Sequence, residues 1–188
     1  MFAVIILLAV LLIAVIVTAL SASIIVGLVQ ARGVPFVSTD KKDFDGILSA
    51  AGLKPGEMIY DLGCGKGTLL IRAAKKFGAK GIGYEISLWP WLWAQFNIWL
   101  SRTDVKVYLK NFFKADLSRA DVVFCYLFPE VMAKLEPKFQ KEMKPGSRVV
   151  SYSFKLPNLQ PAEVIESKDQ PHLMKPLATS GKIHVYKF

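Results

Sequence analysis

The N-terminal end of this 188-residue chain carries no charge, because no charged side chain precedes Arg32, and this feature most limits how the chain can fold. The run from Phe2 to Val29 is apolar and is interrupted only by small residues, Thr18, Ser21, Ser23 and Gly27. As an α-helix this run would be about 42 Å long, whereas the hydrocarbon core of a bilayer is about 30 Å thick. Residues 1–31 are therefore predicted to form a single transmembrane anchor.

A cleaved signal peptide is the alternative interpretation of this run, and Ser21-Ala22-Ser23 would pass as its cleavage site. Against it, no Lys or Arg precedes the run, which is about twice as long as the apolar region of a signal peptide. An uncleaved anchor is therefore favoured. Basic residues follow it closely at Arg32, Lys41 and Lys42, and the positive-inside rule then predicts the rest of the chain on the cytoplasmic side.

The two cysteines are consistent with that side of the membrane. Cys64 and Cys125 are far apart in the sequence and match no C-x-x-C pattern. Such cysteines are typical of reduced thiols in a reducing compartment.

Beyond the anchor, the chain has the composition of one globular domain. All 24 basic and 15 acidic residues lie there, about a quarter of that part, which is usual for a folded domain and excludes disorder, a coiled coil or a multispan membrane protein. The first interpretation of the net charge of +9 is that the basic side chains lie on solvent-exposed faces of helices. Beside anionic headgroups, each basic side chain would also gain about 1 kcal/mol. Nucleic-acid binding is disfavoured because no recognition motif accompanies the charge.

Short apolar runs alternate with helical patterns along the rest of the chain, which predicts an α/β fold with a mainly parallel sheet and helices on both faces. The expected helices cover residues 42–51, 68–77, 92–101 and 131–143. The expected strands cover residues 58–62, 81–84, 105–109, 122–126, 148–154, 163–166 and 182–188. Residues 32–52 are then a lead-in segment with its helix, and residues 53–188 are the main domain.

The most informative stretch is a glycine-rich loop between a predicted strand and a predicted helix. Asp61 ends the strand, and Gly63, Gly65 and Gly67 follow at alternating positions. Glycine allows a tight turn and lets a ligand approach the backbone closely. Glu85 lies at the end of the next strand, where a carboxylate can accept hydrogen bonds from ribose hydroxyl groups.

Three classes of ligand can be compared for this loop. A phosphate-binding NTPase loop requires Ser or Thr directly after Gly-Lys, but Gly67 follows Lys66 here. A dinucleotide site has the spacing G-x-G-x-x-G, whereas this loop has G-x-G-x-G, and Asp61 would repel a pyrophosphate. A ligand with a nucleoside and a cationic or zwitterionic tail fits the loop better.

The stretch from Asp61 to Gly67, together with Gly83-Tyr84-Glu85, resembles the cofactor motifs of class I S-adenosylmethionine-dependent methyltransferases. The resemblance implies a Rossmann-like methyltransferase sheet and S-adenosyl-L-methionine as the cofactor. It also implies that the loop passes under the methionine and ribose, that Glu85 binds the ribose, and that Asn111 with Phe112 meets the adenine. Asn111 stands where the family usually has Asp, and an ordinary turn-forming residue is its alternative interpretation.

A closer resemblance covers most of the chain, from the anchor to about Phe154. The chain is similar to small membrane-anchored seven-strand protein-lysine methyltransferases of mitochondria, known for methylating the ATP synthase c subunit and the adenine nucleotide translocase, and to their prokaryotic relatives. This resemblance implies that the lead-in folds over the cofactor, with Thr39 in contact with it. Ser38, where relatives tend to have proline, departs from the pattern. The resemblance to these lysine methyltransferases rests on segments 35–39, 83–92, 111–114, 122–129 and 135–138.

The same resemblance implies that the end of the fourth strand faces the reactive methyl group. Tyr126, Phe128 and Pro129 are therefore the candidate substrate-pocket residues, and a plain strand end with a proline stop is their alternative interpretation. No Asn-Pro-Pro-Tyr motif is present, which argues against methylation of nucleobase or glutamine amino groups. No general base is assigned, and His172 and His184, with two distant cysteines, form no metal site.

The sequence therefore predicts a protein-lysine methyltransferase acting on a membrane protein, with the bilayer as a second partner and with neither metal nor nucleic acid. The alternatives are a methyltransferase of a lipid or quinone, and a catalytically silent scaffold that binds the cofactor. The clustered tryptophans at 89, 91 and 93 alternate around Pro90 and cannot all face one core. Either they pack against the sheet, or some of them hold the domain against the bilayer.

Overall fold

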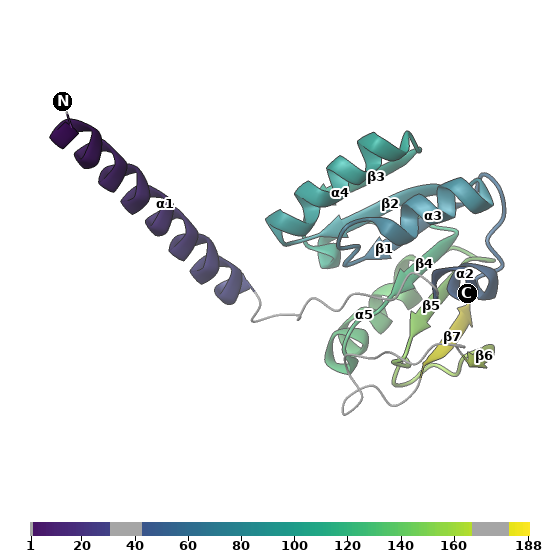
Figure 1. Cartoon of the computed structure of the whole chain (residues 1–188). Coiled ribbons are helices and arrows are strands. Elements are labelled where there is room, and N and C mark those ends of the chain that lie inside the picture. The colour runs from purple at the N-terminus through teal and green to yellow at the C-terminus, as the bar shows by residue number, and fades with distance from the viewer. Residues whose placement is uncertain (1, 31–42, 167–180) are drawn as a thin grey trace. The chain divides into compact units, whose positions relative to one another are not determined.

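The computed structural model describes residues 2–30, 43–166 and 181–188 (Figure 1). The chain forms two compact units, residues 1–36 and residues 37–188, and each is described by itself. Of the predicted lead-in at residues 32–52, the part from 32 to 42 lies outside the described residues, and so do Thr39 and His172.

The first unit contains one helix, α1 (Phe2–Gln30). Its segment Phe2–Ser23 has 22 residues and a mean hydropathy of 3.3, so that it is long and apolar enough to cross a membrane. The hydroxyl groups of Thr18 and Ser21 donate to carbonyl oxygens one turn earlier, at 2.9 and 2.7 Å. Its hydroxyl groups are thus satisfied within the helix, as an apolar surrounding requires.

The second unit is built on a seven-stranded sheet with the order β3-β2-β1-β4-β5-β7-β6. The strands β1 to β5 are parallel, and β7 is antiparallel to both β5 and β6. The mainly parallel sheet of the predicted α/β fold is therefore confirmed. The strands are β1 (Met58–Leu62), β2 (Lys80–Glu85), β3 (Val105–Leu109), β4 (Val122–Cys125), β5 (Arg148–Tyr152), β6 (Glu163–Glu166) and β7 (Lys182–Lys187).

Four helices accompany the sheet: α2 (Asp43–Ala50), α3 (Thr68–Phe77), α4 (Leu88–Ser101) and α5 (Pro129–Glu142). Successive side chains of a strand point to opposite faces of its sheet. One buried cluster joins α2, α3 and α4 to strand residues such as Ile59, Val107 and Val150. The alternate strand residues, such as Val123 and Val149, are also buried but lie outside that cluster, on the face that α5 covers.

Two helices begin earlier than the sequence predicted, and each has a proline in its first turn. α4 begins at Leu88 rather than Leu92 and includes Pro90 in its first turn, and α5 begins at Pro129. The first turn of a helix tolerates proline, because its backbone N–H groups have no acceptor within the helix.

The strand β5 ends at Tyr152, two residues before the predicted end at Phe154. Ser153 adopts a left-handed conformation with φ of 66°. Its N–H donates to the Lys182 carbonyl, whereas that of Phe154 turns back to the Tyr152 carbonyl. This turn interrupts the regular ladder and redirects the chain at the carboxyl end of β5.

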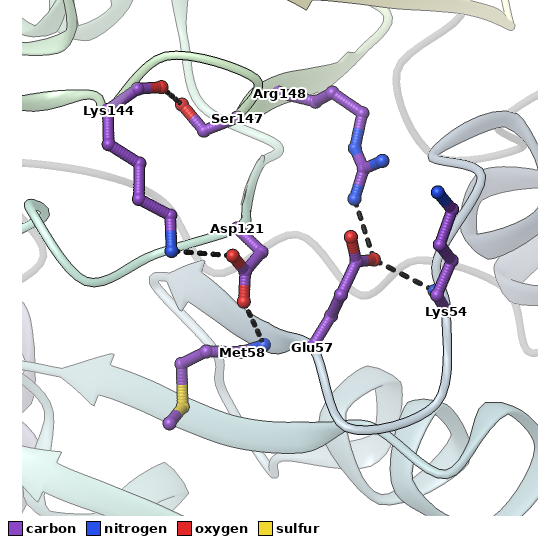
Figure 2. Close-up of polar contacts among 7 residues, drawn as sticks. All are labelled: Lys54, Glu57, Met58, Asp121, Lys144, Ser147 and Arg148. Atoms are coloured by element: carbon purple, nitrogen blue, oxygen red, sulfur yellow. Dashed lines mark hydrogen bonds and ion pairs between the residues drawn. The ribbon is translucent and has the colours of Figure 1, made fainter.

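Ion pairs hold together the amino ends of β1, β4 and β5 (Figure 2). Asp121, just before β4, accepts the Met58 N–H at 2.7 Å and pairs with the Lys144 ammonium at 2.6 Å. Glu57, just before β1, pairs with the Arg148 guanidinium at 2.6 Å and accepts the Lys54 N–H at 2.8 Å. The carboxylates of Asp121 and Glu57 therefore each have both a backbone donor and a basic partner.

Candidate active site

The opposite edge of the sheet contains the point at which the strand order reverses. The chain passes outward from β1 through β2 to β3 and then returns to place β4 on the other side of β1. In open α/β sheets, ligands bind outside the carboxyl ends of the strands at such a point. The glycine-rich loop after β1 lies at this position.

The three glycines of the loop all adopt left-handed conformations, with φ of 89° at Gly63, 53° at Gly65 and 71° at Gly67. A residue with a Cβ atom would be strained at each of them. The N–H groups of Gly63 and Cys64 both donate to the Tyr84 carbonyl, at 2.9 and 3.0 Å. The loop is thereby held against the end of β2, and the predicted need for glycine is confirmed.

Gly83, within β2, supports the same loop through its lack of a side chain. A Cβ atom built there would lie 2.6 Å from the Cys64 Sγ and 2.8 Å from the Leu70 Cδ1. The sequence presented Gly83 only as part of a motif, and its packing role depends on the pairing of β1 with β2. Glycine is required here for close approach rather than for its backbone angles.

The Glu85 carboxylate connects three segments at the end of β2. One oxygen accepts the Gly65 N–H at 2.9 Å, and the other accepts the N–H groups of Ile86 and Ser87, both at 2.8 Å. The side chain is 7% exposed. An ionised carboxylate has about four acceptor positions, so Glu85 fixes the loop and the start of α4 and can still accept from a ligand.

Asp61 lies near the carboxyl end of β1 and is 4% exposed. Burial first, and then the nearby charge of Glu85, raise the pKa of this carboxyl to about 8. Within the described part of the chain, no basic side chain forms an ion pair with Asp61 or Glu85. Two buried carboxyl groups thus lie close together, and no described basic side chain pairs with either of them.

Asn111 follows β3 on the other side of β2. Leu109 pairs with Glu85 in the parallel register, and the Lys110 N–H donates to the Glu85 carbonyl at 2.9 Å. These contacts bring Asn111 and Phe112 to the same edge as the loop. The Asn111 side chain accepts the Phe113 N–H at 2.9 Å and caps a short 3-10 helix (Phe112–Lys114), so its turn-forming role is present in the structure.

Beyond β4, aromatic side chains gather next to the glycine loop. The ring of Tyr126 lies 5.1 Å from that of Tyr152 and 6.3 Å from that of Phe154, and the Phe128 and Phe154 rings are 5.9 Å apart. Leu127 connects this cluster to the loop, since its Cδ2 atom would lie 3.5 Å from a Cβ atom at Gly63.

Two members of this cluster, Tyr152 and Phe154, were missed by the sequence analysis. The sequence signal that could have identified them is the alternation of these aromatic residues at the end of the strand predicted at residues 148–154. Pro129, also predicted for the pocket, is the first residue of α5, which agrees with its interpretation as a stop to the strand.

His184, the histidine in the described part of the chain, lies away from this edge of the sheet. His184 is buried in β7, three strands from β1, which corresponds to about 14 Å at the usual spacing. Burial, then the neighbouring charges of Lys182 and Lys155, lower its pKa. Among the residues that the structure describes, no group of three or more His, Cys, Asp or Glu could hold a metal ion.

A comparison with protein-family models shows to which family the chain belongs. Residues 61–163 match the model of the ANTKMT methyltransferase domain. The chain belongs to this family. It is also 39% identical over 139 residues to a protein-lysine N-methyltransferase of Saccharolobus islandicus, a match that covers 72% of this chain and 86% of that relative.

Two further similarities extend the comparison. The chain is 33% identical to the adenine nucleotide translocase lysine N-methyltransferase of Mus musculus over 70% of its own length, and it spans 58% of that relative. A crystal structure of an RNA methyltransferase from Salinibacter ruber with S-adenosyl-L-homocysteine superposes with a TM-score of 0.72 at 30% identity, over 80% of this chain and 93% of that one.

The chain is therefore an S-adenosylmethionine-dependent methyltransferase with the Rossmann-like fold of its class. The groups at this edge are suited to the cofactor. S-Adenosylmethionine carries a sulfonium, an ammonium and two ribose hydroxyl groups, and the buried carboxyl groups of Asp61 and Glu85 can accept these without competition from a basic side chain.

Proposed function

We propose that this enzyme is a protein-lysine N-methyltransferase that acts on a membrane protein. The observation that carries the proposal is the 39% identity to a protein-lysine N-methyltransferase of which the chain spans 86%. The membrane substrate is supported by the apolar helix α1 and by the similarity to a lysine methyltransferase of the adenine nucleotide translocase.

The proposed cofactor contacts follow from the loop and the strand ends. Gly63, Gly65 and Gly67 would let the cofactor approach the backbone, and the carboxylate of Asp61 would face its positive charge. Glu85 would accept hydrogen bonds from the ribose hydroxyl groups. Three further residues complete the proposed cofactor site, namely Asn111 and Phe112 beside the adenine and Thr39 from the lead-in.

The aromatic cluster after β4 would prepare the lysine for reaction. When bound, the cofactor supplies a methyl group on a sulfonium, and the lysine nitrogen must approach it with a free lone pair. At pH 7 in water, deprotonation of a lysine ammonium group costs about 4.6 kcal/mol. Around Tyr126, Phe128 and Phe154, an apolar surrounding would disfavour the ammonium form and reduce that cost. The same rings would align the nitrogen with the methyl group.

We also propose that α1 is an uncleaved membrane anchor with the methyltransferase domain on the cytoplasmic side. The support is the length and apolarity of the helix and the basic residues Arg32, Lys41 and Lys42 that follow it. An anchor would confine the enzyme to the bilayer surface and raise its effective concentration near membrane-protein loops.

The test is incubation of the full-length enzyme in membranes of its own host with methyl-labelled S-adenosylmethionine. Protein, organic-soluble material and RNA are then separated, and the lysines of the labelled protein are mapped by mass spectrometry. We expect the label in a membrane protein, with loss of label for Glu85→Ala and retention for Glu163→Ala, a control at an exposed carboxylate.

The other two fractions would overturn the substrate assignment. Label in the organic phase would indicate a lipid or quinone methyltransferase, and label in RNA would indicate the activity for which the Salinibacter ruber relative is named. No transfer to any fraction by an enzyme that binds the cofactor would indicate a silent scaffold.

The substrate side of the site is tested separately with Phe128→Ala. Phe128 is half-buried and contacts Phe154, so the variant should keep its fold and its affinity for S-adenosylhomocysteine. The transfer rate on the identified protein should fall about tenfold to a hundredfold, as expected for a misaligned nucleophile. An unchanged rate would remove the cluster from the substrate site.

A further inference from the structure

The helix α4 exposes a continuous apolar face. Residues 89, 92, 93, 96, 99 and 100 follow one another at helical spacing, and their side chains are 42–73% exposed. All four tryptophans of the chain lie in this helix, at positions 89, 91, 93 and 99. The exposed rings also contact one another, with centroids of Trp93 and Phe96 at 6.1 Å and of Phe96 and Trp99 at 6.0 Å.

The opposite face attaches α4 to the domain. Ala94 is fully buried, and Trp91 and Ile98 pack against the core. The Trp91 indole N–H and the Gln95 amide both donate to the Val107 carbonyl, at 3.0 and 2.8 Å. The two interpretations of the tryptophans therefore apply to different residues, since Trp91 packs on the sheet while Trp93 and Trp99 do not contribute to the core.

The exposed charges that border this face are mostly basic, with Asp104 just beyond the helix as an acidic exception. No Asp or Glu occurs between Ile86 and Thr103. At one side of the face, the Lys66 ammonium lies 6.0 Å from the centre of the Trp93 ring. At the end of the helix, Arg102 is exposed. The face therefore combines apolar rings, which can enter the headgroup region, with cations that can meet anionic headgroups.

We propose that the outer face of α4 is a second membrane contact, which lies in the interfacial region of a bilayer with anionic headgroups. Tryptophan favours this region because its ring is apolar while its N–H remains hydrated. A second copy of the chain fits the face less well. In a two-fold contact, the same surface would face itself, and Lys66 and Arg102 would be opposed by Asp104 alone among these bordering side chains.

This contact would also place the active site at the membrane surface. The face begins directly after Glu85, whose carboxylate accepts the N–H of Ser87, the residue before α4. An α4 that lies in the headgroup region would keep this edge of the sheet close to the bilayer. The inference rests on the proposed function in one respect, that α1 holds the chain at a membrane.

Tryptophan emission tests the proposal in the full chain, because every tryptophan lies in α4 and none lies in α1. The enzyme is reconstituted into phosphatidylcholine–phosphatidylglycerol vesicles, with bromine on the acyl chains either near the headgroup or near the bilayer centre. We expect quenching, stronger for the shallow bromine, because an interfacial helix is buried only about 5–10 Å into the headgroup boundary.

Two variants form a matched pair for this measurement. Trp93→Phe/Trp99→Phe removes exposed emitters and should reduce the quenched fraction. Trp91→Phe removes the emitter packed on the core and should increase that fraction. Thermal unfolding of both variants identifies any loss of fold.

Three other outcomes would contradict either the α4 contact or the α1 anchor. Enzyme that stays in the vesicles after alkaline carbonate washing but is not quenched would overturn the α4 contact. If cross-linking then joins α4 to another copy, the face belongs to a self-association interface. Enzyme that carbonate releases would overturn the anchor, and quenching before the wash would still support the α4 contact.

Discussion

The two edges of the sheet carry the same kind of side chain in opposite electrostatic surroundings. At the amino edge, Asp121 and Glu57 each pair with a basic side chain at 2.6 Å (Figure 2). At the carboxyl edge, Asp61 and Glu85 are buried, and no described basic residue forms an ion pair with either of them. Asp121 and Glu57 thus have basic partners within the protein, whereas no described basic side chain neutralises the charge of Asp61 or Glu85.

The pKa values of the two aspartates express this difference. Burial would raise the pKa of Asp121, but the hydrogen bonds from Lys144 and from the Met58 N–H outweigh it and lower the pKa. For Asp61, burial and then the charge of Glu85 together raise the pKa to about 8. Asp121 has its basic partner in place, whereas Asp61, as a proposed cofactor contact, would receive its partner from the ligand.

The largest expected effect is that of Glu85→Ala on cofactor affinity. Backbone N–H groups already occupy three of the roughly four acceptor positions of Glu85, which leaves one charge-assisted hydrogen bond to the ribose, worth about 1.5–3 kcal/mol. The dissociation constant for S-adenosylhomocysteine should therefore rise by about 10 to 10². Calorimetric titration would measure it, with Glu163→Ala as the control. Unchanged affinity in a folded Glu85→Ala enzyme would place the cofactor elsewhere.

The next effect is a pH dependence of cofactor binding that arises from Asp61. A raised pKa means that the ligand-free protein is stabilised at low pH and loses this stability as the pH rises through about 8. The ammonium group of S-adenosylhomocysteine requires the ionised form of Asp61, so affinity for this ligand should increase with pH, by roughly twenty-fivefold between pH 6 and 7.5. Titrations across this range would measure it. Asp61→Asn should bind weakly with no such slope, and a slope that persists would assign it to another group.

A third prediction concerns the packing beneath the loop. Gly83→Ala would place a methyl group 2.6 Å from the Cys64 sulfur and should lower the free energy of unfolding by about 1–3 kcal/mol. The matched control is Gly46→Ala in α2, where the nearest atom to a Cβ would be 4.0 Å away. That variant should be neutral or stabilised by up to about 1 kcal/mol. Denaturant unfolding compares the two, and equal stabilities would contradict the close approach at Gly83.

The smallest expected effect belongs to the amino edge. Asp121→Asn removes the charge that faces Lys144 but keeps an oxygen that can accept the Met58 N–H. Because the pair is partly exposed, the loss of stability at pH 7 should be about 1 kcal/mol or less. It should disappear in the acid range, where the lowered pKa of Asp121 no longer stabilises the fold. Cofactor affinity should not change, and a tenfold change would mean that the two edges are coupled.

Much of the cofactor edge could be predicted from the sequence, because its features are local in the chain. The left-handed glycines, the strand before them and the carboxylate at the end of the next strand all follow from short-range backbone preferences. The apolar helix α1 was also evident, since its length and lack of charge require no knowledge of contacts. These properties depend on residues that are close in sequence, and the sequence by itself determined them.

Other properties depended on which strands lie side by side. Tyr152 and Phe154 join Tyr126 only because β5 pairs with β4. The separation of Trp91 from Trp93 depends on the earlier start of α4 and on its packing over β3. The raised pKa of Asp61 requires burial beside Glu85 in the folded sheet. Each of these results comes from contacts between residues distant in the chain, and only the tertiary structure decided them.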